Sequence, residues 1–230
     1  PTPTPEATPG ETPEATPAET PEGTPGETPA AGAAPTLATG DQWVWSVTYG
    51  AQTNTYTEVV TGEEQVDSTM AYSTEITIDP DSERLYSGID ATISGYERWL
   101  DTENLDEIKS VMPIEAMGMT ITATIESTVT HATAKWPLAV GTTWTVERTT
   151  TVNPPLASPS TVTRTVTVEA EEDVTVPAGT FTCFKIVTTE GGEVVKTEWF
   201  SGEVKNNVKV IDTAFGEDET WELTSYTVAE

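Results

Sequence analysis

Acidic side chains recur at the spacing of a calcium-binding loop in one stretch of this 230-residue sequence. Asp79, Asp81 and Glu83 occupy positions 1, 3 and 5 of a twelve-residue stretch that ends at Asp90, and carboxylates at this spacing supply oxygen ligands to Ca²⁺. The stretch departs from the pattern at position 6, where Arg84 replaces the glycine needed for a sharp turn. Asp79, Asp81 and Glu83 are therefore candidate metal ligands, and an ordinary Asp-Pro-Asp turn is the competing interpretation.

Two pairs of aromatic residues are candidates for ligand binding. Trp43 and Trp45 lie two positions apart, and Tyr96 and Trp99 lie three positions apart. Aromatic rings on an exposed face stack on sugars or line an apolar cleft. A single large ring in a strand more often belongs to a core, because its burial contributes a few kcal/mol. That interpretation is favoured for the tryptophans Trp136, Trp144 and Trp199, which lie in or next to predicted strands.

Residue types that carry nucleophilic or zinc chemistry are scarce. The chain has one histidine, His131, and one cysteine, Cys183. This excludes an intrachain disulfide and a cysteine-based zinc site, and it leaves Ser/His or Cys/His catalysis dependent on His131. We interpret His131 as a surface or strand-edge residue and Cys183 as a buried small hydrophobe. Among the abundant carboxylates no pair stands in a recognisable glycosidase frame. We predict no catalytic residue, no cofactor, and a protein that is not an enzyme.

The composition argues against two classes of partner. The chain carries 10 Lys and Arg against 38 Asp and Glu, a net charge of -28, and a field of that sign repels nucleic-acid backbones. No run of residues approaches the roughly 18 apolar residues of a membrane-spanning helix. The sequence predicts no nucleic-acid partner and no transmembrane segment in this chain.

The first 40 residues form a separate segment. From Thr4 they repeat four-residue units such as TPEA and TPGE, with glutamate and no Lys or Arg. Proline fixes the backbone and little apolar surface is available, so residues 1–40 are predicted to be a disordered or polyproline-like stalk. In polyproline geometry residues 1–35 would reach about 100 Å. The absence of an initiator Met indicates a mature form, and similar stalks occur in secreted bacterial proteins. We expect an extracellular or cell-surface bacterial protein, anchored through residues that precede the stalk.

Residues 41–230 are predicted to form one β-rich domain. Trp43, Trp45, Val47 and Tyr49 alternate with the polar Ser46 and Thr48, which is the period of a half-buried strand. Comparable runs rich in Val, Ile, Thr and Tyr continue to Val228 and give about ten strands. Breaks such as Asp79-Pro80-Asp81 and Gly191-Gly192 are placed at hairpin turns, so the sheet is expected to be antiparallel. The loop from Asn153 to Ser158 is predicted to join two Thr-rich strands as a long hairpin.

One short helix is predicted, from Asp101 to Met112. Leu105, Ile108 and Met112 fall at positions i, i+3 and i+7, Asp101 or Thr102 can cap the first turn, and Pro113 ends the run.

Several segments that follow one another along the chain carry a family resemblance. The segments are Gly40 to Trp43, Trp136 to Trp144, Val174 to Ile186, Glu198 to Phe200 with Val204 and Lys205, and Glu222 to Tyr226. In these segments the sequence resembles the TapB-like group of secreted bacterial domains of unknown function, over nearly the whole region from residue 40 onward. The resemblance implies an outline similar to the LolA and LppX type of lipoprotein carrier: a strongly curved antiparallel sheet or half-open barrel with a short helix near its concave side.

Three functional hypotheses remain open. The first is a non-catalytic, stalked binding module outside the cell that holds an apolar or amphipathic ligand, a lipid or a peptide, in the concave face of its sheet. The second is a structural cell-surface or filament subunit that assembles with itself or with cell-envelope components through its sheet edges or its stalk. The third is a hydrolase that uses two carboxylates. We favour the first.

Overall fold

The computed structural model describes residues 32–86, 89–153, 159–214 and 218–229. Residues 1–31, which contain most of the predicted stalk, lie outside this range, as do residues 154–158 of the predicted loop between the Thr-rich strands. The described chain forms twelve antiparallel strands. Their bounds are β1 Gln42–Tyr49, β2 Gln52–Val66, β3 Thr69–Tyr86, β4 Ile89–Asp101, β5 Glu107–Ala116, β6 Met119–His131, β7 Thr143–Asn153, β8 Ser160–Val176, β9 Gly179–Glu190, β10 Glu193–Ser201, β11 Asn206–Asp212 and β12 Glu219–Thr227.

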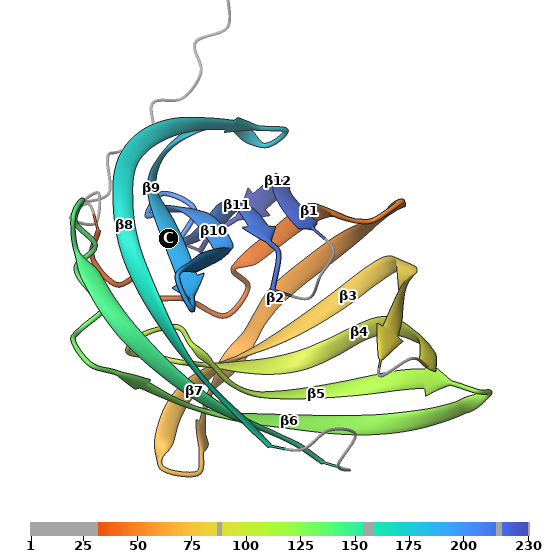
Figure 1. Cartoon of the computed structure of the whole chain (residues 1–230). Helices are drawn as coiled ribbons and strands as arrows, with labels where there is room; N and C mark the ends of the chain where they lie inside the picture. The colour runs from red at the N-terminus through yellow and green to blue at the C-terminus, as the bar shows by residue number, and fades with distance from the viewer. Residues whose placement is uncertain (1–31, 87–88, 154–158, 215–217, 230) are drawn as a thin grey trace, which may run out of the picture.

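The sheet closes on itself as a barrel (Figure 1). Each strand pairs with the strand before and after it in the sequence, and β1 completes the ring by pairing with β12, from Gln42 opposite Thr227 to Tyr49 opposite Glu219. The alternation in β1 therefore has a physical cause, since one face of every strand turns toward the enclosed interior. None of the described residues forms a helix that is long and apolar enough to cross a membrane.

A buried carboxylate holds the two ends of the barrel together. Asp41, directly before β1, is 0% exposed. Its oxygens accept hydrogen bonds from the backbone of Ala38 at 3.0 Å and from the backbone of Ala229 after β12, and Lys205 in the β10–β11 turn lies 3.3 Å away. One side chain thus joins the chain entering the barrel, the chain leaving it and a neighbouring turn.

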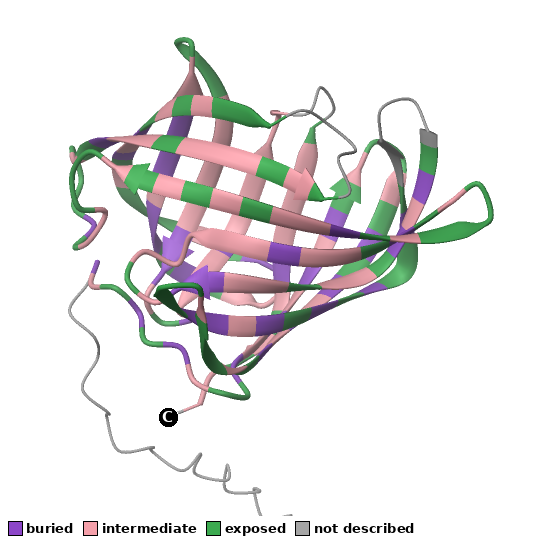
Figure 2. Ribbon diagram, turned by 90° about the horizontal axis from the view of Figure 1, so that it is seen from below, coloured by how far each residue is buried: buried purple, intermediate pink, exposed green. Residues whose placement is uncertain are grey.

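The interior is filled unevenly. The main core gathers residues from β1 to β4, from the β8–β9 hairpin and from β11 and β12, with Trp43, Val47 and Leu223 each 0% exposed. In contrast, β6 and β7 each contain a single buried residue, Ala123 and Trp144. Figure 2 shows this contrast as long strands that alternate between intermediate and exposed positions, while the buried positions gather elsewhere in the wall. The inner faces of β6 and β7 therefore border space that side chains do not fill.

The segment from residue 32 to residue 40, which the sequence assigned to the stalk, packs on the barrel. Leu37 is 6% exposed and belongs to the main core. Leu138 donates its backbone N–H to the carbonyl of Gly32 at 2.6 Å. Gly32 has a φ of 81°, and a Cβ at this position would lie 2.1 Å from the Leu138 oxygen, so only glycine permits the approach. The predicted extended stalk is left to residues 1–31, outside the described range.

The predicted helix from Asp101 to Met112 is absent, and a tight turn followed by β5 takes its place. Asp101 does accept backbone N–H groups, from Glu103 at 3.0 Å and Asn104 at 2.6 Å. The chain then reverses at Leu105, whose φ is 57°, and pairs with β4 and β6. Ser110, Met112 and Ile114 alternate inward along β5. Met112, one of the three residues that suggested the helix, therefore fits a period of two, whereas Leu105 lies in the turn before β5.

Three other expectations need correction. The sheet has twelve strands where about ten were predicted, and it is a closed barrel where a half-open one was expected. Asp79-Pro80-Asp81 is not a hairpin turn, because it lies within β3, where the register with β4 jumps between Thr77 and Ser82. The antiparallel sheet is confirmed, and so is the long hairpin of β7 with β8. The turn that joins β8 to β9 buries both Val176 and Phe181.

Replacement of the Asp41 carboxylate tests its role in closure. Asp41→Ala leaves two backbone N–H groups and Lys205 without their acceptor, and we expect a loss of about 3 kcal/mol in the free energy of unfolding. Urea unfolding monitored by tryptophan fluorescence measures this loss. The control is Asp173→Ala, because Asp173 is exposed and accepts one hydrogen bond, from Thr182. Equal effects of the two substitutions would contradict the role of Asp41.

Candidate functional site

A cavity of about 740 Å³ occupies the part of the barrel that the core leaves open. This volume lies within the range of roughly 300–1,000 Å³ that is typical of small-molecule sites. Its wall comes mainly from the inward faces of β4 and β6 to β10. The apolar part of the wall is continuous with a second hydrophobic cluster, to which Trp136, Trp144, Val166, Ile186 and Phe200 belong.

Basic side chains are concentrated in this cavity. Six of the chain's 10 Lys and Arg line it, against four acids. When these are taken from the totals of 10 and 38, the rest of the chain keeps 4 bases and 34 acids. The cavity is therefore positive inside a strongly negative protein. The bases are Arg98, Lys135, Arg148, Arg164, Lys196 and Lys205, and the acids are Asp106, Glu107, Glu198 and Asp212.

Arg98 is held by a buried carboxylate beside the cavity. Its Nε and Nη2 donate to the two oxygens of Glu58 at 2.8 and 2.7 Å, and Glu58 is 1% exposed. Burial by itself would lower the pKa of the Arg98 guanidinium, but the Glu58 carboxylate outweighs this effect and raises it. Burial also raises the pKa of Tyr96, which lines the same wall. The Arg98–Glu58 pair is thus a fixed structural feature of the cavity wall.

Glu198 forms a second, more accessible pair on β10. Lys196 lies 2.8 Å from its carboxylate, and the Asn207 amide donates to it at 2.9 Å. Burial by itself would raise the pKa of Glu198, but Lys196 and Lys135, together with these hydrogen bonds, outweigh burial and hold the pKa below its usual value. Glu198 is therefore ionised at neutral pH and neutralises Lys196.

Two buried nitrogen atoms on the cavity wall have no hydrogen-bond partner within the described structure, Nδ1 of His131 and Nε1 of Trp136. His131 pairs with Asp106 through Nε2. Because the Asp106 carboxylate accepts, Nε2 carries the proton, and in the neutral imidazole Nδ1 remains an acceptor. The Trp136 indole N–H is a donor without an acceptor. His131 thus lies on the cavity wall and not at the exposed edge that the sequence suggested.

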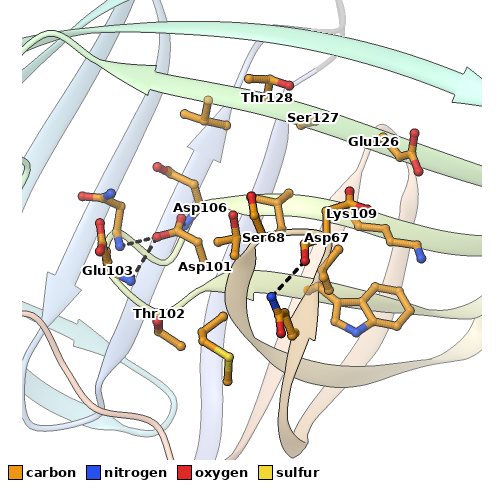
Figure 3. A pocket seen from close by; sticks show the side chains of 18 of the residues that line it. Asp67, Ser68, Asp101, Thr102, Glu103, Asp106, Lys109, Glu126, Ser127 and Thr128 are labelled. Carbon is orange, nitrogen blue, oxygen red and sulfur yellow. Dashed lines mark hydrogen bonds between the residues drawn. The ribbon is translucent and has the colours of Figure 1, made fainter.

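A separate groove of about 1070 Å³ lies between the end of the β2–β3 hairpin and the β4–β5 turn. Figure 3 shows Asp67 and Ser68 of the hairpin near Asp101 and Glu103 of the turn, with Glu126 on β6. The Asp101 carboxylate is already occupied by backbone N–H groups of its own turn. The groove is acidic, and the Asp101 carboxylate in it stabilises the β4–β5 turn.

The four aromatic residues that the sequence proposed as ligand contacts do not lie together in the structure. Trp43 and Trp45 stack in the main core, 0% and 5% exposed, and their indole N–H groups donate to the carbonyls of Val204 and Asn207. They do not form an exposed platform. Tyr96 lines the cavity, whereas Trp99 lines the outer groove and donates to Glu64. An odd separation along β4 places these two rings on opposite faces.

The three proposed metal ligands, Asp79, Asp81 and Glu83, are exposed along β3. Asn54 donates its side-chain amide to the carbonyls of Pro80 and Asp81 at 2.7 and 3.3 Å, so the segment forms a bulge fixed by main-chain contacts. Within the described ranges there is no group of three or more His, Cys, Asp or Glu side chains arranged to hold a metal ion.

The sequence analysis missed the inward-facing bases, although the sequence contains a signal for them. Arg148 follows Trp144 and Val146 at intervals of two, and Arg164 stands between Val162 and Val166 at the same interval. A cation in phase with the apolar residues of a strand must face the interior. Residue type alone, without the position of each base in this alternation, does not identify them.

Comparison with known proteins assigns no family. No family model matches the chain, and no curated protein matches it. Among solved structures, it is similar to a Bacteroides fragilis protein described as a "putative exported protein with YmcC-like fold". That similarity has a TM-score of 0.37 and 10% sequence identity, and it covers 84% of this chain and 98% of the other. The resemblance to the TapB-like group therefore remains a prediction, and the half-open carrier outline that it implied is replaced by the closed barrel.

The contact between Lys196 and Glu198 predicts how the stability of the fold depends on pH. Because the pKa of Glu198 is lower in the folded protein than in the unfolded chain, its ionised form stabilises the fold at neutral pH. This contribution is lost as the pH falls through the lowered pKa. Lys196→Met removes the ammonium and keeps the burial, so we expect the pKa of Glu198 to rise, as measured by NMR titration of the side-chain carboxyl.

The stability advantage of the wild type over Glu198→Gln should accordingly shrink between neutral pH and pH of about 3. The exposed Glu193 on the same strand provides the control, and Glu193→Gln should show a much smaller pH dependence. An unchanged pKa of Glu198 in Lys196→Met would refute the conclusion that Lys196 lowers this pKa.

Proposed function

We propose that the protein is a non-catalytic, extracytoplasmic binding module that holds an amphipathic ligand inside its barrel. The observation that carries the proposal is the cavity of about 740 Å³, which has an apolar part and a charged part on one continuous wall. The Thr-Pro-Glu repeat of residues 1–31 supports a location outside the cytoplasm, where it would act as a spacer between the barrel and an anchoring surface.

The distribution of polarity favours an amphipathic ligand over a purely apolar one. Trp144, Ile186 and Phe200 are buried residues of the wall that offer an apolar surface. Arg148 and Lys196 are half-buried on the same inner face. A purely apolar occupant would bury the charge of Arg148, which has no carboxylate partner among the described residues, without compensation, and this costs several kcal/mol.

Closure of the sheet weighs against assembly through sheet edges. Every described strand has a hydrogen-bonded neighbour on both sides, so the barrel offers no free edge among these residues. Assembly through the stalk concerns residues outside the described range. The binding module is therefore the function that the geometry supports best.

The proposal is tested with a neutral fluorescent probe, N-phenyl-1-naphthylamine, so that the result does not depend on charge. We expect saturable binding with increased, blue-shifted emission. Val162 lines the cavity, and its exposed neighbour Thr163 faces outward on the same strand. Val162→Trp fills the cavity and should weaken binding about tenfold or more.

The matched control is Thr163→Trp, which adds the same ring to the outer face and should leave the affinity unchanged. Circular dichroism confirms that both variants fold. If the wild type does not bind the probe, or if Val162→Trp and Thr163→Trp bind it equally, the ligand site is not in the barrel and the proposal fails.

A further inference from the structure

The six bases that line the cavity differ in how they are neutralised. Five of them have a carboxylate oxygen within 4.0 Å, and each of these five is thereby at least partly compensated within the protein. The pairs are Arg98 with Glu58, Lys135 with Asp106, Arg164 with Glu190, Lys196 with Glu198 and Lys205 with Asp41.

Arg148 is the exception. Its one hydrogen bond in the described structure runs from Nη1 to the backbone carbonyl of Glu107, at 3.4 Å. A guanidinium offers five N–H donors, so most of the donors of this half-buried side chain remain free within the described structure. Arginine is commonly satisfied by planar oxyanions that accept two parallel hydrogen bonds.

The surroundings of Arg148 add to the positive charge. In the β7–β8 ladder Arg148 stands opposite Val162, and Val146 stands opposite Arg164. The two arginines are thus diagonal neighbours on the inner face, within reach of one group. Within the described residues Arg164 pairs with one carboxylate, that of Glu190, whose side chain is 43% exposed and open to water. A pair of guanidinium groups with one exposed counterion leaves a net positive site.

The apolar part of the wall lies next to this site along the same strands. Trp144 is four residues from Arg148 on β7, and Val166 is two residues from Arg164 on β8, with both apolar residues facing the cavity. A ligand that binds Arg148 through one end can therefore lay an apolar body along Val146 and Trp144 on β7 and against Val166 on β8.

We propose that Arg148, assisted by Arg164, binds the oxyanion end of a single-chain amphiphile whose apolar chain occupies the rest of the cavity. This inference rests on the proposed function and specifies its ligand class. The chemistry recognised is a terminal oxyanion, which a fatty carboxylate and an alkyl phosphate both provide.

The test is displacement of N-phenyl-1-naphthylamine by four amphiphiles that share a dodecyl chain: dodecanoate, dodecyl phosphate, dodecanol and dodecyltrimethylammonium. We expect the two anions to bind about tenfold more tightly than the alcohol, the difference that one charge-assisted hydrogen-bonded contact provides. The cation should bind more weakly than the alcohol. A preference between the two anions identifies the source of the oxyanion.

Substitutions test whether Arg148 causes the preference for anionic amphiphiles. Arg148→Gln should bring the affinity for dodecanoate to within about threefold of that for dodecanol, with both affinities calculated from the variant's own affinity for the neutral probe. Arg148→Lys, which keeps the charge, should retain part of the preference, and Arg164→Gln should reduce it by a smaller factor. The control is Lys185→Gln, because Lys185 pairs with Glu169 and does not line the cavity.

The possible failures are distinguishable. If the wild type binds the neutral probe and binds dodecanoate and dodecanol equally, the oxyanion site is refuted and the proposed function stands. If Arg148→Gln keeps the full preference for anions, the assignment to Arg148 is refuted. If the wild type binds neither the probe nor any of the amphiphiles, the proposed function itself is refuted.

Discussion

Closure of the sheet between β1 and β12 is the constraint on which the remaining features depend. Once the ring is complete, every strand has one inward and one outward face, and the number of strands sets the enclosed width. A barrel of about eight strands is just filled by its own side chains. Twelve strands enclose more space, and the main core fills only part of it. The cavity is therefore a consequence of the strand number, and Asp41 secures the closure that creates it.

The same constraint explains what happens to polar residues inside the barrel. A buried charge is tolerated where a partner satisfies it, as Glu58 satisfies Arg98 with two hydrogen bonds. These two residues lie on β2 and β4, the two neighbours of β3, where Glu58 is opposite Ile76 and Arg98 is opposite Thr74. Such a pair rigidifies one side of the cavity. Arg148, which donates to the Glu107 carbonyl, has no comparable carboxylate partner among the described residues. The contrast between the two arginines distinguishes a structural charge from one that is available to a ligand.

The sequence reveals local features of this fold more readily than long-range ones. Alternation along β1, β7 and β8 predicted strands correctly, because the period of a strand is written in consecutive residues. The closing pair of β1 with β12 joins segments about 180 residues apart, and nothing local distinguishes a closed ring from a half-open one. The helix predicted at Asp101–Met112 failed because it rested on three apolar residues, of which Leu105 lies in a turn and Met112 also fits the period of a strand. The role of Trp43 and Trp45 was also uncertain from the sequence, because alternation shows that they share a face but not whether that face is covered.

The separation of charge between the inside and the outside of this barrel sets the kinetics of its encounter with any anion. An approaching anion first meets the field of the rest of the chain, with 4 bases against 34 acids, and only then the positive interior. Long-range repulsion slows such an encounter, and it is screened over a Debye length of about 10 Å at 0.1 M salt. Contacts inside the cavity are screened much less. Added salt should consequently speed the entry of an anion more than it weakens its retention, the reverse of complexes in which opposite charges attract at long range and association is fastest at low ionic strength.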